Sequence, residues 1–208
     1  MHRVALRRLR TKRTSELGPV DGGFTLIELM VVLLIIAILL AIAIPTFLGV
    51  TSSADDRSAQ SNLSNGLTEA TAQYENAGET YSGISALLSA SAPEFTWTAS
   101  SSPCTTLTAN CISVYSVDVA SSTDQQGLIV AAMSKTGTCW WVARLQATPT
   151  VLATPGFDTS TSTQSGAATA GTFYAKKSNA GSTNCKATYP ESQTTFTWGT
   201  SFQTAGSN

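Results

Sequence analysis

Residues 23–50 read GFTLIELMVVLLIIAILLAIAIPTFLGV, and this stretch decides the fold. From Leu29 to Ile44, sixteen apolar residues follow one another without interruption. With the largely apolar residues on either side, the segment is long enough to cross a bilayer as a helix. Glu28 lies close to its start, although a carboxylate inside a membrane helix costs free energy. The stretch therefore predicts a membrane helix. Its single charge, on Glu28, indicates a function beyond anchoring, because an anchor does not need a carboxylate.

The residues before this stretch have a different character. Residues 1–23 are basic, then rich in turn-forming residues, and end in a Gly-Gly pair, which is typical of a leader peptide and not of a folding unit. Their six Lys and Arg residues lie only on the N-terminal side of the apolar run. The positive-inside rule then keeps this end in the cytoplasm and exports the rest of the chain. An ordinary signal peptide cleaved after Ala43 and a plain single-pass anchor are the alternatives.

Residues 51–78 continue the helical pattern with an amphipathic surface. Four apolar residues are spaced four, three and four apart, which places them on one face of a helix. They are Leu63, Leu67, Ala70 and Tyr74. Pro45 removes one backbone hydrogen bond and predicts a kink, not an end, so we expect one helix from about Thr25 to Ala77. Gly78 is its expected C-terminal cap, and the apolar stripe needs a sheet to cover it.

Residues 79–208 change to short strands among Ser, Thr and Gly turns. β-Branched and aromatic runs predict an antiparallel sheet, with a loop over Ser160–Ala170. The expected strands are Cys111–Ala120, Gly127–Ser134 and Thr138–Gln146, with weaker candidates at Thr172–Lys176 and Thr194–Trp198. Trp140 and Trp141 alternate along a strand, so we expect one in the core and one on the surface. The predicted fold class is α+β, a long helix packed on a sheet.

Composition excludes several kinds of chemistry. The chain has 208 residues, of which 26 are Ser, 31 are Thr and 12% are charged. Its one histidine is His2, so the exported body has no imidazole for a catalytic triad or a zinc site. Beyond residue 23 there are six Lys or Arg residues against eleven Asp or Glu, a balance that disfavours nucleic-acid binding. We predict no enzymatic activity, no metal and no cofactor.

Two groups of charged residues have some of the features of a binding site. Asp118, Asp124 and Asp158 have oxygen atoms for a calcium ion, but their spacing fits no EF-hand loop, so we interpret them as solvated loop acids. Three lysines with aromatic neighbours have the composition of a DNA-binding patch, and we interpret them as a solvated loop. They are Lys176, Lys177 and Lys186.

Four cysteines, Cys104, Cys111, Cys139 and Cys185, are widely spaced and form no CxxC pair. In an exported chain this pattern predicts two disulfides, although four cysteines allow three connectivities. The short separation of Cys104 from Cys111 favours a local bond, which leaves Cys139 to pair with Cys185 and to pin the C-terminal region onto the sheet.

The N-terminal stretch resembles the class III signal and first helix of bacterial type IV pilins, a segment that pseudopilins of type II secretion share. The resemblance is close from Gly23 to about Val50. It implies that a prepilin peptidase cleaves between Gly23 and Phe24 and methylates the new amino group of Phe24. It also implies that Glu28 pairs with that amino group during assembly and that Pro45 is the family's kinking proline. Ala37 departs from the glycine that many pilins have at that place.

The resemblance and the residue patterns together divide the chain into four parts. Residues 1–23 are the leader, 24–50 the membrane and filament-core helix, 51–78 its amphipathic continuation and 79–208 the globular head. The implied partners are other copies of the chain and other pilins, the peptidase, an inner-membrane assembly platform, and membrane lipid before assembly. The implied location is the inner membrane and then a surface pilus. A pseudopilin of a secretion or competence system is the alternative, followed by a tethered adhesin or enzyme domain.

Overall fold

The computed structural model describes residues 23–108, 110–120, 123–149, 164–165, 169–190, 193 and 196–208. The expected leader therefore lies, apart from Gly23, outside the described residues. The chain divides into two units, Met1–Thr46 and Phe47–Asn208, and each is described by itself.

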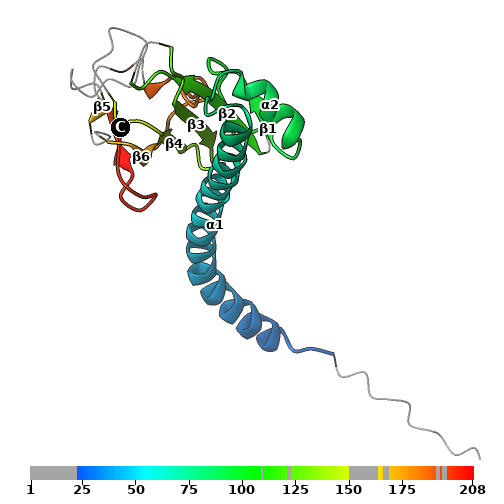
Figure 1. The fold of residues 1–208 in the computed structure, drawn as a ribbon. Coiled ribbons are helices and arrows are strands. Elements are labelled where there is room, and N and C mark those ends of the chain that lie inside the picture. Colours follow the sequence, from blue (N-terminus) through cyan, green and yellow to red (C-terminus); the bar gives the residue numbers. More distant parts are fainter. Residues whose placement is uncertain are drawn as a thin grey trace, which may run out of the picture. The chain divides into compact units, whose positions relative to one another are not determined.

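Helix α1 (Leu26–Asn76) begins in the first unit and continues into the second (Figure 1). The expected single helix from about Thr25 to Ala77 is confirmed, and Pro45 lies inside it. Over the first unit its apolar side chains are exposed, and the described residues include one helix long and apolar enough to cross a membrane. Such a surface needs lipid or protein around it, because water disfavours contiguous exposed apolar area.

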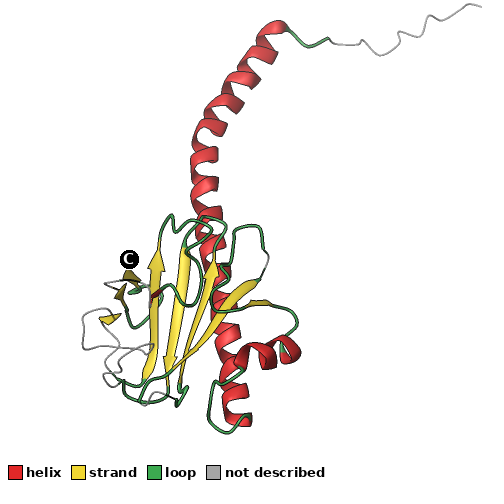
Figure 2. Ribbon diagram, turned by 90° about the horizontal axis from the view of Figure 1, so that it is seen from above, coloured by secondary structure: helices red, strands yellow, loops and turns green. Residues whose placement is uncertain are grey.

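The second unit contains a six-stranded sheet with the C-terminal part of α1 on one face (Figure 2). The strand order is β1-β2-β3-β4-β6-β8. The bounds are β1 Thr96–Thr98, β2 Cys111–Val117, β3 Gly127–Met133, β4 Cys139–Leu145, β6 Gly171–Lys177 and β8 Gly206–Ser207. The central strands β2, β3, β4 and β6 pair antiparallel as predicted. The predicted antiparallel sheet is extended at both edges by β1 and β8, which pair parallel to their neighbours.

Two further elements, a second helix and a strand in the predicted loop, differ from the expectation, whereas strand β7 (Phe196–Thr197) lies within the weaker candidate Thr194–Trp198. Helix α2 (Ile84–Ser91) follows α1 and buries Ile84 and Leu88. Strand β5 (Gln164–Ser165) lies inside the stretch predicted to be a loop, and it pairs with β7 (Phe196–Thr197) in a second, two-stranded sheet. Two-residue strands carry no periodicity of their own, so pairing alone defines them.

The face of the sheet that α1 covers holds one hydrophobic core. The apolar stripe of the helix packs here, with Leu63 and Ala70 fully buried against Ile112, Leu128 and other residues of the strands. Gly66 lies close against the sheet, since a Cβ atom there would be 2.6 Å from Cδ1 of Ile112. The amphipathic pattern of residues 51–78 is thus matched by a sheet, as the sequence requires.

The opposite face of the sheet holds a second core, formed with the C-terminal third of the chain. Trp141 is fully buried there and stacks on Tyr189, with ring centroids 5.4 Å apart. Trp140 faces α1 and is 5% exposed. The two tryptophans do alternate, but the expectation that one lies on the surface is wrong, because both faces of the sheet are covered.

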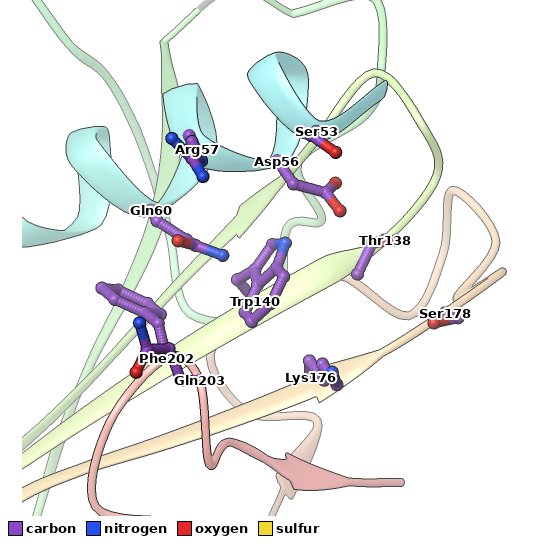
Figure 3. A pocket seen from close by; sticks show the side chains of 10 residues that line it. All are labelled: Ser53, Asp56, Arg57, Gln60, Thr138, Trp140, Lys176, Ser178, Phe202 and Gln203. Atoms are coloured by element: carbon purple, nitrogen blue, oxygen red, sulfur yellow. The ribbon is translucent and has the colours of Figure 1, made fainter. Parts of the chain in front are cut away.

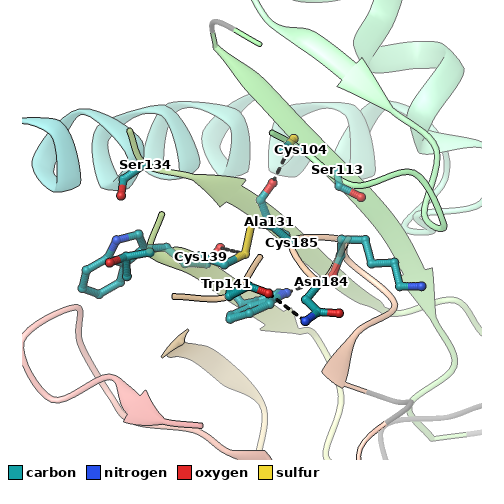
Figure 4. Close-up of a disulfide and its surroundings, with 12 residues drawn as sticks. Cys104, Ser113, Ala131, Ser134, Cys139, Trp141, Asn184 and Cys185 are labelled. Carbon is teal, nitrogen blue, oxygen red and sulfur yellow. Dashed lines mark hydrogen bonds between the residues drawn. A yellow bond between two sulfur atoms is a disulfide. The ribbon is translucent and has the colours of Figure 1, made fainter. Parts of the chain in front are cut away.

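Two disulfides tie the second unit together, Cys104–Cys111 and Cys139–Cys185. They join the same pairs that the cysteine spacing favours. Figure 4 shows the surroundings of the second bond. The backbone N–H of Cys104 donates to the carbonyl of Cys185 at 2.7 Å, so the two bonds are directly connected. The indole N–H of Trp141 donates to the carbonyl of Lys186 at 2.9 Å, which holds the same segment on strand β4.

Helix α1 ends as Gly78 predicts. Gly78 has a φ of 81°, and the N–H of Glu79 donates to the carbonyl of Tyr74 at 3.0 Å, the long bond of a Schellman motif. The chain then buries Tyr81, whose hydroxyl accepts a hydrogen bond from Nε2 of Gln146 at 3.1 Å. Burial raises the pKa of Tyr81 above the ordinary tyrosine value, and the hydrogen bond from Gln146 opposes that rise.

The edge strand β8 depends on a glycine at position 206. A Cβ atom on Gly206 would collide with the backbone carbonyl of Thr197, which cannot rotate away. We expect Gly206→Ala to detach the C-terminal strand and to lower the free energy of unfolding by about 3 kcal/mol. Urea unfolding followed by tryptophan fluorescence measures this. Ser207→Ala, at the exposed neighbouring residue, is the matched control, and equal stability of the two variants would contradict the prediction.

Candidate functional site

The first turn of α1 forms a reciprocal hydrogen-bonded box. The backbone N–H of Glu28 donates to Oγ1 of Thr25 at 3.2 Å, and the backbone N–H of Thr25 donates to Oε2 of Glu28 at 3.0 Å. The hydroxyl of Thr25 also donates to Oε2 at 2.9 Å. This is the capping box that a Thr and a Glu three residues apart form at a helix start. It fixes the Glu28 carboxylate at the positive end of the helix dipole.

The box gives Glu28 a second role, that of a helix cap, beyond the expected pairing with the amino group of Phe24. The pattern Thr25-Leu26-Ile27-Glu28 before an apolar run is itself the sequence signal of a capping box. Both Thr25 bonds end on Oε2, and no described residue donates to Oε1. One carboxylate oxygen therefore stabilises the helix end, while the other is available to a further donor.

The expected cleavage residues lie immediately before this box. Gly23 and Phe24 precede the helix, and the Phe24 side chain is 89% exposed. A Cβ atom on Gly23 would meet nothing within 4 Å, so the fold itself makes no demand for glycine there. The backbone nitrogen of Phe24 is one residue from that of Thr25, which already bonds Glu28. If the chain began at Phe24, its free amino group would therefore lie close to the Glu28 carboxylate.

Beyond the first turn, α1 has apolar side chains on all sides up to Ile44, and those described are exposed. Where polar residues begin, their hydroxyls bond back to the helix. Thr46 Oγ1 donates to the carbonyl of Ile42 at 3.0 Å, and Ser52 and Ser53 donate to Leu48 and Gly49. Each hydroxyl thus finds its hydrogen-bond acceptor within the helix. A segment surrounded by lipid or apolar protein requires this, because no water is there to accept the bond. The kink expected at Pro45 remains a prediction.

The other residues with some of the features of a binding site have local partners. Oδ1 of Asp124 accepts the backbone N–H of Val119 at 2.8 Å, and Oδ1 of Asp118 accepts that of Gln125 at 3.0 Å. These bonds order the loop after β2, and Asp158 lies outside the described residues. The described residues contain no group of three or more His, Cys, Asp or Glu able to hold a metal ion.

The three lysines do not gather into one patch. Nζ of Lys176 lies 5.6 Å from the ring centroid of Trp140, which belongs to the core under α1. Nζ of Lys177 lies 5.8 Å from the ring of Tyr189, which belongs to the opposite core. Successive residues of β6 send the two charges to opposite faces of the sheet, so they cannot follow one nucleic-acid backbone together.

Comparisons with known proteins find matches to a family motif and to one protein. Residues 20–44 match the family model described as the prokaryotic N-terminal methylation motif. A stretch of 51 residues is 49% identical to the type IV major pilin protein PilA of Myxococcus xanthus (strain DK1622). That match covers 24% of this chain and 23% of the Myxococcus protein. No solved structure matches the chain.

The chain therefore carries the prokaryotic N-terminal methylation motif, and part of it is similar to a type IV major pilin. The motif lies across the predicted cleavage site, the capping box and the apolar part of α1.

Proposed function

We propose that the chain is a structural subunit of a type IV pilus, not an enzyme. The observation that carries the proposal is the pairing of the methylation motif with the exposed apolar part of α1, residues 26–50, whose one acidic residue is held at the helix start. The apolar surface suits a membrane before assembly and contact with other subunits afterwards, because both environments remove it from water.

Processing follows from the position of the charges. Cleavage before the apolar run, by a prepilin peptidase on the cytoplasmic side, removes the basic leader that holds the helix in the inner membrane. The helix can then leave the bilayer, with an assembly platform as the partner that lifts it. N-methylation of Phe24 keeps the positive charge of the amino group and reduces its hydration. That lowers the free-energy cost of burying the group in a filament.

Glu28 is the proposed assembly residue. In a filament core the dielectric constant is low, so an ammonium and a carboxylate attract each other much more strongly than in water. The capping box supports this role because it leaves Oε1 open beside the start of the mature chain. The ammonium belongs either to the same subunit or to a neighbour.

The sheet unit is proposed to form the outer part of the filament, in contact with other copies or other pilins. Its two covered faces and two disulfides suit a module that meets the extracellular medium. The likeness to a protein named as a major pilin favours a pilus over a pseudopilus. Mass spectrometry of material sheared from cells tests this, since an abundant subunit there supports a pilus and its absence contradicts it.

The mature protein is predicted to begin at Phe24 and to carry an N-methyl group. Leader removal at the Gly23–Phe24 bond leaves the apolar helix at the N-terminus, where the filament needs it. N-terminal peptide mass spectrometry of the mature chain measures both features. An N-terminus at Ile44, as an ordinary signal peptidase would leave, would overturn the proposed processing.

Variants of Gly23 distinguish recognition by the peptidase from a structural requirement for glycine. The fold leaves open space around Gly23, so a larger residue should not disturb the helix. We expect Gly23→Ala to be cleaved much better than Gly23→Trp, because the peptidase must accommodate a small residue before the bond it cuts. Equal cleavage of both variants would contradict this recognition.

A further inference from the structure

A pocket of about 610 Å³ opens in the second unit, between α1, strands β4 and β6, and the segment before β8 (Figure 3). Trp140 lies at its centre and is 5% exposed. Its Nε1 atom is buried and has no hydrogen-bond partner among the described residues. The nitrogen-bearing edge of the ring faces Asp56. A buried N–H without an acceptor costs about 1–3 kcal/mol, so a ligand that brings an acceptor here is favoured.

The charges around this indole favour an anionic group. Beyond residue 23 the chain has six Lys or Arg residues, and two of them, Arg57 and Lys176, line this one pocket. Asp56 is the acidic residue of the lining, and its Oδ1 already accepts the hydroxyl of Thr136 at 2.7 Å. Two cations therefore stand against one partly engaged carboxylate. Hydrogen bonds from such cations to a carboxylate are about twice as strong as neutral ones.

The rest of the wall is uncharged and polar, with one further aromatic ring. The amide side chains of Gln60 and Gln203 line the pocket and can each donate and accept, as sugar hydroxyls require. The ring of Phe202 meets Trp140 edge to face, with centroids 5.9 Å apart, and adds an apolar surface. An isolated acidic group would use the cations but would bring no hydroxyl to either amide.

We propose that this pocket binds a sugar that carries a carboxylate. Trp140, Arg57 and Lys176 recognise the acid group, and Gln60 and Gln203 recognise the hydroxyls. The site goes beyond the proposed filament role and does not depend on assembly, since every lining residue belongs to one chain.

The test is nuclear magnetic resonance of the indole N–H groups of the full chain in detergent micelles, titrated with D-glucuronate and D-galacturonate. The chain has four tryptophans, and Trp140→Phe assigns the relevant signal. We expect a saturable shift of the Trp140 signal, and Lys176→Gln should weaken binding about tenfold, as the loss of one charge-assisted contact predicts. Lys177→Gln is the matched control, because that side chain lies over Tyr189 on the other face and should leave binding unchanged.

Three results would overturn the proposal. The first is no shift with either uronate, and the second is glucose binding as tightly as glucuronate. The third is acetate alone shifting the signal as strongly at the same concentration, which would point instead to an acidic side chain of another subunit. If Trp140→Phe fails to fold, the Lys176→Gln and Lys177→Gln pair still decides the outcome.

Discussion

Cells that make the Glu28→Val variant are expected to insert and cleave the precursor but to assemble no filaments. Insertion should not suffer, because the substitution removes a charge from a membrane segment. Assembly should fail, because the ammonium at Phe24 would enter a low-dielectric core without its carboxylate, and an unpaired buried charge is strongly unfavourable. Electron microscopy of sheared material and immunoblotting of membranes measure the two outcomes. Methylation of Phe24 must be checked separately by mass spectrometry. A loss of methylation in the variant would be a second change at the start of the mature chain.

The capping box makes a sharper version of this experiment possible. Glu28→Val loses both the charge and the cap, whereas Glu28→Gln retains an oxygen that can accept the two bonds from Thr25. We expect Glu28→Gln to keep the helix start but still to build no filaments. Normal filaments from Glu28→Gln, with none from Glu28→Val, would refute charge pairing and assign the effect to the cap.

Thr25 supplies the complementary control. Thr25→Val removes the hydroxyl from the box and leaves the charge, at an expected cost of about 1 kcal/mol to the helix start. Thr25→Ser preserves the hydroxyl and should behave as the parent chain does. Filaments should therefore form in both variants, in reduced amount with Thr25→Val. Complete loss of filaments in Thr25→Val would contradict a primary role for the charge.

Removal of the Cys139–Cys185 disulfide is expected to destabilise the second unit far more than removal of Cys104–Cys111. The two bonds span 46 and 7 residues. The loop-entropy relation then assigns about 4 kcal/mol to the longer closure and about 2 kcal/mol to the shorter one. The longer bond also lies in the core opposite α1, among the buried residues around Trp141.

Paired Cys→Ser variants avoid leaving a lone thiol. We expect the double variant of Cys139 and Cys185 to unfold at a much lower urea concentration than that of Cys104 and Cys111. All four tryptophans lie in the second unit, so their fluorescence in the detergent-solubilised full chain reports its unfolding alone. Equal losses in the two variants would show that local strain, not loop length, sets the contribution of each bond.

The sequence by itself determined the long helix and the central strands. The apolar run before and after Pro45, the stripe from Leu63 to Tyr74 and the cap at Gly78 are local patterns, and local patterns specify a helix wherever it packs. The same holds for the β-branched runs that became β2, β3 and β4. The methylation motif could be recognised for the same reason, because it is a run of contiguous residues.

Only the tertiary structure decided what covers each face of the sheet. Burial of both Trp140 and Trp141 depends on the C-terminal segment, which folds over the face opposite α1. The residue pattern of the strand does not predict that this second face is covered. The parallel edge strands β1 and β8 likewise exist only because long-range pairing satisfies their backbone groups. The pocket at Trp140 joins residues more than a hundred positions apart, from Ser53 to Gln203. Such proximity is a property of the folded chain, since side chains distant in sequence meet only after packing has brought their elements together.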